Sequence, residues 1–117
     1  MPDSPIPNLL VLRVRDIDRA AEFYRKIGLE LVIERHGKGP EHYASEIEGF
    51  VFEIYPQTDH SQPTTGVRIG FQVHSIDKVV ADLAEAGAEV VTAPHDSPWG
   101  RRAVVKDTDG HMVELTE

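Results

Sequence analysis

Hydrophobic positions along the chain follow two periodicities, which predict short strands and two amphipathic helices. Residues 9–14 form a short apolar run typical of a strand, and residues 17–26 change to helical spacing. Asp16 or Asp18 suits the cap of this helix, and Gly28 is a stop signal after it. The apolar face of the predicted helix consists of Ile17, Ala20, Ala21 and Tyr24.

The same two periodicities continue to the end of the chain, interrupted by glycine- and proline-containing turns such as residues 37–40. They predict strands at residues 29–35, 42–47, 50–55 and 67–73, a second helix at 76–86, and strands at 89–92, 102–106 and 112–116. The apolar positions of the second helix are Val79, Val80, Leu83 and Ala84.

The chain contains a weak internal repeat. Residues 14–18 (VRDID) recur 59 positions later as residues 73–77 (VHSID), and residues 49–54 recur 61 positions later as residues 110–115. Each copy therefore has the order βαβββ, with two residues inserted in the middle of the second.

This repeat predicts an α+β fold in which two tandem βαβββ modules form a curved mixed sheet around a concave cavity. Module one covers about residues 8–56, a polar linker covers 57–65, and module two covers about 66–117. Three or four strands with one helix leave much apolar surface uncovered, so we expect one domain, residues 1–117, and not two independent halves.

Composition excludes several classes of protein. The net charge of −8 opposes binding to nucleic acid, and the chain has no apolar run long enough for a membrane helix. The first residues lack the features of a signal peptide, so we expect a cytoplasmic protein. Without cysteine, thiolate nucleophiles and thiolate metal sites are also excluded.

Two segments resemble the vicinal oxygen chelate superfamily of glyoxalases, bleomycin-resistance proteins and extradiol dioxygenases. They are residues 14–28, with FYRKIGLEL following from Phe23, and the ending from Pro98-Trp99-Gly100 to DTDGHMVEL at residues 107–115. The resemblance covers nearly the whole chain and is closest to the glyoxalase and bleomycin-resistance branch.

The resemblance implies four metal-ligand positions, which fall on Leu9, Glu53, Arg68 and Glu114. Leucine offers no donor atom and arginine carries a permanent positive charge, so a divalent metal is disfavoured and no cofactor is expected. Arg68 is instead expected to neutralise Glu53, Glu114 or both, because a guanidinium can bridge carboxylates.

Glu53 and Glu114 occupy equivalent positions of the repeat, so we expect both on one concave surface, where they are the candidate catalytic residues. The further candidate ligand-binding residues are Arg13, His42, Tyr55, Arg68, Gln72, Trp99 and Arg101. Residues 42 and 43 alternate in a strand, so either His42 or Tyr43 faces inward. His36 and His42 flank a turn, where a surface hairpin is a commoner explanation than a metal pair.

Trp99 is the only tryptophan, and it either covers a ligand or packs its loop onto the sheet.

Three functions remain open. The leading hypothesis is a homodimeric protein that binds a small organic molecule without a tightly bound metal. The alternative is a lyase, isomerase or thiol transferase of the glyoxalase type that uses Glu53 and Glu114. A catalytically silent domain retained for protein contacts is the third, and an extradiol dioxygenase is disfavoured because Leu9 and Arg68 stand where histidines are needed.

Overall fold

The computed structural model describes residues 4–117, which contain eight strands and two helices. In chain order they are β1 (Leu9–Val14), α1 (Ile17–Ile27), β2 (Val32–Glu34), β3 (His42–Ile47), β4 (Phe50–Pro56), β5 (Arg68–Gln72), α2 (Ile76–Glu85), β6 (Val90–Ser97), β7 (Gly100–Lys106) and β8 (Met112–Thr116). Neither helix is long and apolar enough to cross a membrane.

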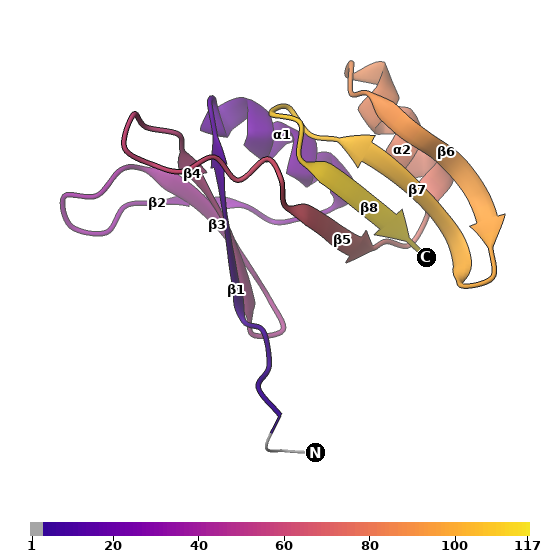
Figure 1. Cartoon of the computed structure of the whole chain (residues 1–117), viewed down its shortest axis with the longest axis horizontal. Helices are drawn as coiled ribbons and strands as arrows, with labels where there is room; N and C mark the ends of the chain where they lie inside the picture. The colour runs from indigo at the N-terminus through magenta and orange to yellow at the C-terminus, as the bar shows by residue number, and fades with distance from the viewer. Residues whose placement is uncertain (1–3) are drawn as a thin grey trace.

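The strands form two four-stranded sheets with the same internal order, β1-β4-β3-β2 and β5-β8-β7-β6 (Figure 1). In each sheet the first and last strands of the module pair in parallel, and the remaining pairs are antiparallel. The expected α+β fold of two βαβββ modules is confirmed. The two sheets are separate in the chain and do not close into a barrel.

Helix α1 begins and ends where its local sequence dictates. The Asp16 side chain accepts hydrogen bonds from the backbone N–H groups of Asp18 and Arg19, which makes Asp16 the N-cap. Gly28 ends the helix at a φ of 123°, a value that L side chains rarely adopt, and its N–H bonds to the carbonyl of Arg25. The buried face comprises Ala20, Ala21, Phe23, Tyr24 and Ile27.

Strand β6 is longer than the pattern predicts, because it continues through Pro94 to Ser97. Proline cannot donate a ladder hydrogen bond, but β6 is an edge strand and its pairing with β7 shifts register between Thr92 and His95. From the sequence, the segment around Trp99 is expected to be a loop. Because β6 extends to Ser97, which pairs with Gly100 of β7, it is a tight turn with Trp99 at its tip.

Three aromatic rings pack where the two modules meet. The ring of Tyr24 in α1 lies 4.9 Å from that of Phe52 in β4 and 6.1 Å from that of Phe71 in β5, and the two phenylalanine rings are 5.7 Å apart. Such tilted and edge-on contacts are favourable for aromatic pairs. The cores of the two modules are therefore continuous.

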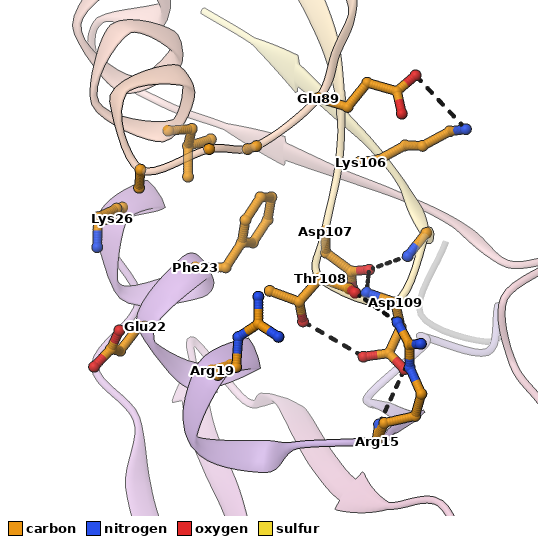
Figure 2. A pocket seen from close by; sticks show the side chains of 15 residues that line it. Arg15, Arg19, Glu22, Phe23, Lys26, Glu89, Lys106, Asp107, Thr108 and Asp109 are labelled. Carbon is orange, nitrogen blue, oxygen red and sulfur yellow. Dashed lines mark hydrogen bonds and ion pairs between the residues drawn. The ribbon is translucent and has the colours of Figure 1, made fainter.

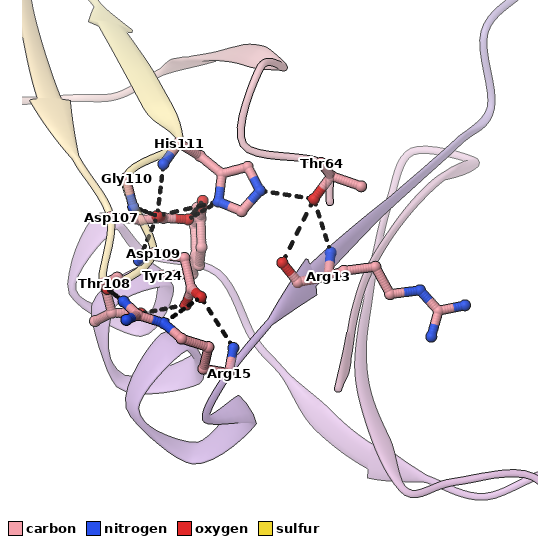
Figure 3. Close-up of polar contacts among 9 residues, drawn as sticks. All are labelled: Arg13, Arg15, Tyr24, Thr64, Asp107, Thr108, Asp109, Gly110 and His111. Atoms are coloured by element: carbon pink, nitrogen blue, oxygen red, sulfur yellow. Dashed lines mark hydrogen bonds and ion pairs between the residues drawn. The ribbon is translucent and has the colours of Figure 1, made fainter. Parts of the chain in front are cut away.

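A buried polar network links module two to the linker and β1 (Figure 3). The Asp107 carboxylate accepts a hydrogen bond from the Tyr24 hydroxyl at 2.6 Å and lies 2.8 Å from Nδ1 of His111. Nε2 of His111 is 2.7 Å from Oγ1 of Thr64, which also accepts a hydrogen bond from the N–H of Arg13. These bonds connect module two to α1, to the linker and to β1, and so fix the position of the two modules relative to each other.

The network shifts the ionisation of its members. Burial alone would raise the pKa of Asp107, but the hydrogen bonds from His111 and Tyr24 outweigh it, so the pKa is lowered. Burial, followed by the charge of Asp107, raises the pKa of Tyr24 well above its ordinary value. Asp107 is therefore held ionised, and Tyr24 is held as a neutral hydrogen-bond donor.

Candidate functional site

Glu53 and Glu114 stand at equivalent positions of the two sheets. Glu53 is paired with Val11 and Ala44 on its neighbouring strands, and Glu114 with Gly70 and Val104. Their neighbours along β4 and β8 are buried core residues, so alternation directs both carboxylates to the sheet face away from the helix. We call these two sheet faces, which carry Glu53 and Glu114, the open face.

On the first sheet, Glu53 lies in a group of four polar side chains. His42 of β3 has its Nε2 atom 3.6 Å from Oε2 of Glu53 and 3.6 Å from Oε1 of Glu34. His36, in the turn after β2, has its Nε2 atom 3.4 Å from the same Glu34 oxygen. Of the alternating residues His42 and Tyr43, it is His42 that lies on the open face. Tyr43 lies on the opposite face, where its hydroxyl donates a hydrogen bond to Asp18 of α1.

Three planar groups stack beside this cluster. The rings of His42 and Tyr55 are 4.1 Å apart and nearly parallel, and the guanidinium of Arg13 lies 5.0 Å from the centre of the Tyr55 ring. Burial, then the charge of Glu53, raises the pKa of Tyr55, and Arg13 acts in the opposite direction. Four of the candidates from the sequence, Arg13, His42, Glu53 and Tyr55, are therefore brought together.

On the second sheet, Glu114 forms an ion pair with Arg102 of β7. The pair lines a hollow of about 550 Å³. Its other lining residues are His95, Ser97, Trp99 and Thr116. Trp99 is 87% exposed, so it does not pack its turn onto the sheet.

The expected bridge from Arg68 is absent in the described part of the chain. Arg68 is exposed, pairs in register with Met112 and forms no ion pair within residues 4–117, and Gln72 is exposed as well. Arg102 takes the place expected for Arg68 at Glu114, because it lies on the adjacent antiparallel strand and reaches the carboxylate diagonally.

Arg101 lies on the other side of β7 from Arg102. It donates hydrogen bonds to Asp77 of α2 at 2.9 and 3.1 Å and to Asp96 at 3.0 Å. The hydrogen bond from Arg101 lowers the pKa of Asp77. Arg101 thus ties the β6–β7 hairpin to the helix and is turned away from the hollow beside Glu114.

The four positions that the family uses for a metal do not fit one in this chain. Leu9 is exposed on the open face without a donor atom, and Arg68 brings a positive charge. Glu53 and Glu114 have separate partners, His42 for the first and Arg102 for the second. No step that depends on a metal at these positions follows from this structure.

A further hollow, about 510 Å³, lies between α1 and the turn that joins β7 to β8 (Figure 2). Phe23 points into it, and Lys106 at its side is 3.8 Å from a carboxylate oxygen of Glu89. Its lining includes neither glutamate of the open face. It is therefore separate from the site described above.

Two βαβββ modules with one glutamate at the same point of each last strand define a protein of the vicinal oxygen chelate class. The chain belongs to the Glyoxalase/Bleomycin resistance protein/Dioxygenase superfamily, whose family model matches residues 6–115.

Relatives of known sequence are similar over most of their length. A probable lactoylglutathione lyase from Vibrio parahaemolyticus is 29% identical over 119 residues, covering 92% of this chain and 86% of the relative. An uncharacterized protein from Mycolicibacterium smegmatis is 27% identical over 104 residues, covering 88% and 85%.

Solved structures share the fold. TnmS3, an antibiotic binding protein from Streptomyces sp. CB03234, superposes with a TM-score of 0.76 at 23% identity, covering 97% of this chain and 96% of that one. A glyoxylase/bleomycin resistance protein/dioxygenase domain from Frankia sp. EAN1pec has a TM-score of 0.69 at 23% identity, with coverage of 97% and 96%.

Sequence reasoning did not single out Glu34 and Arg102. Both become neighbours of the candidate residues only through strand pairing, Glu34 opposite His42 and Arg102 opposite Thr116. Strand register brings together residues that lie on different strands and are not neighbours in the sequence. The one usable sequence signal was alternation along residues 29–35 and 102–106, which limits the residues on each face without fixing their partners.

Proposed function

We propose that the protein binds a small organic molecule on its open face and does so without a tightly bound metal at the family's four positions. The observation that carries this proposal is the hollow beside Trp99, because a tryptophan that is 87% exposed leaves a large aromatic surface uncovered. Next to it, the Arg102–Glu114 pair offers charged hydrogen-bonding groups. A planar molecule with polar edge groups suits these surroundings.

The comparisons support a binding role. TnmS3, which has the same fold, is described as an antibiotic binding protein. At 23% identity this similarity concerns the fold, so the ligand has to come from experiment.

Trp99 provides the test, because it is the only tryptophan of the chain. Chelator-treated protein is screened against planar aromatic compounds by thermal shift, and compounds that raise the melting temperature are titrated by tryptophan fluorescence. Trp99→Ala should weaken binding ~5-fold or more, since a stacked aromatic contact contributes about 1 kcal/mol or more. Val91→Ala removes an exposed apolar side chain of β6 and serves as the matched control.

The Trp99→Ala variant is followed by calorimetry or thermal shift, because it has no tryptophan fluorescence. Unchanged affinity in this variant would contradict the proposal. Binding that appears only after a divalent metal is added, and that Glu114→Gln abolishes but His36→Ala does not, would contradict the statement that no metal is bound at the family's four positions.

A glyoxalase-type lyase, isomerase or thiol transferase is the second candidate. It is favoured by the two equivalent glutamates of the open face and by the probable lactoylglutathione lyases among the relatives. The test follows the formation or loss of the lactoylglutathione thioester by absorbance, with and without added zinc or nickel. Activity that disappears in both Glu53→Gln and Glu114→Gln would favour this function over binding alone.

We also propose that the protein is a homodimer. Strands β1, β2, β5 and β6 are unpaired edges of their sheets within the described chain, and Leu9 and Val32 expose apolar surface on the open face. A second copy could cover these surfaces by two-fold symmetry. If neither a ligand nor an activity is found, the remaining hypothesis is a catalytically silent domain that is retained for protein contacts of this kind.

A further inference from the structure

We propose that Glu34, His36, His42 and Glu53 form a binding site for a divalent transition-metal ion such as zinc. Only Glu53 belongs to the positions that the family uses for a metal. The other three ligands come from β2, the turn after it and β3, so the site lies entirely within module one. This inference goes beyond the proposed function, because its ligand is a cation and most of its residues lie outside the family's positions.

The ligand atoms already stand near the distances that a metal requires. One atom from each of the four residues lies within 4.8 Å of all the others. Around tetrahedral zinc, bond lengths of about 2.0–2.1 Å place ligand atoms about 3.3 Å apart. Three histidine–carboxylate contacts of the group, at 3.4, 3.6 and 3.6 Å, are only slightly longer, so small side-chain movements suffice to close the site.

His42 supplies an independent observation. Its side chain is 1% exposed, and its Nε2 atom is buried with no hydrogen-bond partner among the described residues. Its Nδ1 atom is 3.2 Å from the carbonyl oxygen of Pro40, an acceptor, so this contact favours the tautomer with its proton on Nδ1. The bare Nε2 atom then faces carboxylate oxygens of Glu34 and Glu53 at 3.6 Å, which is too long for a hydrogen bond.

Three electron-pair donors that face one another at distances too long for hydrogen bonds form a place for a cation. Burying an unpartnered ring nitrogen is costly, and a metal would satisfy it together with both carboxylates. The bond from Nδ1 to a backbone carbonyl is the usual outer contact of a metal-binding histidine, since it fixes the ring and its tautomer. Stacking on Tyr55 fixes the ring further.

The donor set selects the kind of cation. Two imidazole nitrogens and two carboxylate oxygens suit zinc, nickel or cobalt, whereas calcium and magnesium prefer oxygen alone. Two carboxylates also balance the charge of a divalent ion. The side chains of His36 and Glu34 are 71% and 41% exposed, which leaves a path from solvent to the buried His42.

The test is a zinc titration of chelator-treated, untagged protein by calorimetry, in the absence of any organic ligand. We expect one zinc per chain with micromolar or tighter affinity. His36→Ala and Glu53→Gln should each weaken binding at least ~10-fold, because even loss of an outer contact of a metal site costs this much. His42→Ala should do the same, but since His42 is buried, the exposed His36 provides the variant that keeps its fold.

Two exposed residues offer matched controls, His60→Ala in the linker and Glu46→Gln in β3. Both should bind zinc as the parent chain does. X-ray absorption of the zinc-loaded protein should show two histidine ligands, a readout that nonspecific surface binding would not give.

Absence of zinc binding at millimolar concentration would overturn the proposal. Binding that persists in both His36→Ala and Glu53→Gln would overturn it too. Trp99→Ala should leave the zinc affinity unchanged, so a failure of the organic-ligand site and a failure of the metal site can be told apart.

Discussion

Arg102 and Glu114 form an ion pair on the open face, and each side chain is about one-third exposed, 30% and 31% respectively. Exposed ion pairs of this kind contribute about 0–1 kcal/mol, because water screens them and ordering two side chains costs entropy. The pair is thus better placed to serve a ligand than to hold the fold together.

Arg102→Ala is therefore expected to lower the free energy of unfolding by less than ~1 kcal/mol, as measured by urea denaturation. The same variant should weaken the binding of an organic ligand that uses the hollow beside Trp99. A loss of several kcal/mol would show that the pair supports the fold and would remove this argument for a ligand.

The buried Asp107 is expected to behave in the opposite way. Its carboxylate accepts backbone hydrogen bonds from Asp109, Gly110 and His111 and a side-chain bond from Tyr24. Asp107→Asn should lower the free energy of unfolding by about 3 kcal/mol, since it removes a buried charge from its partners. Asp96→Asn, at an exposed carboxylate of β6, is the control and should change stability little.

The same residue predicts an acid transition. Because the pKa of Asp107 is lowered in the folded state, its contribution to stability is fully present above the pKa of the unfolded chain. That contribution is lost as the pH falls below about 4 towards the folded pKa. Urea denaturation between pH 2 and 7 should show a shallower acid loss for Asp107→Asn than for the parent chain, and equal slopes would count against the network.

Tyr24 makes the corresponding prediction at high pH. Its pKa is raised in the folded state, so its contribution is complete below the unfolded value of about 10 and is lost as the pH rises through the folded pKa. Tyr24→Phe keeps the ring contacts with Phe52 and Phe71 and removes the hydroxyl. Its stability should fall less steeply above pH 10, which denaturation at pH 8 to 11.5 can measure.

Particular residues show how much of the fold could be predicted from the sequence. Asp16 caps the start of α1 and Gly28 ends it, as the chemistry of these residues predicts, because capping and stop residues act through neighbours along the chain. The repeat placed Glu53 and Glu114 at equivalent ladder positions, since the offset of 61 residues that relates them and the offset of 59 residues that relates their partners Val11 and Gly70 lead to the same point of each module. Local chemistry and internal symmetry thus sufficed for the order of the helices and strands, but not for the length of β6.

The contacts within the site could not be predicted from the sequence in the same way. Arg68 and Arg102 are both arginines on the open face of the second sheet, and only the pairing of β7 with β8 decides that Arg102 meets Glu114. The proximity of Glu34 to His42 likewise depends on the register of the β2–β3 hairpin. A strand pattern determines which face a residue occupies, whereas its partners depend on register and twist.

The last prediction concerns assembly. Leu9 and Val32 are 57% and 61% exposed on the open face, beside unpaired strand edges, and a second copy that covers them would bury this apolar surface. Light scattering after size exclusion should therefore give the mass of a dimer at micromolar concentration. Leu9→Lys and Val32→Lys together should shift it towards the monomer, because a buried unpaired charge opposes association. Glu22→Lys also makes the chain more basic but lies on the exposed side of α1, so it should remain dimeric. A parent chain that is monomeric throughout would confine any ligand cavity to the surfaces of one copy.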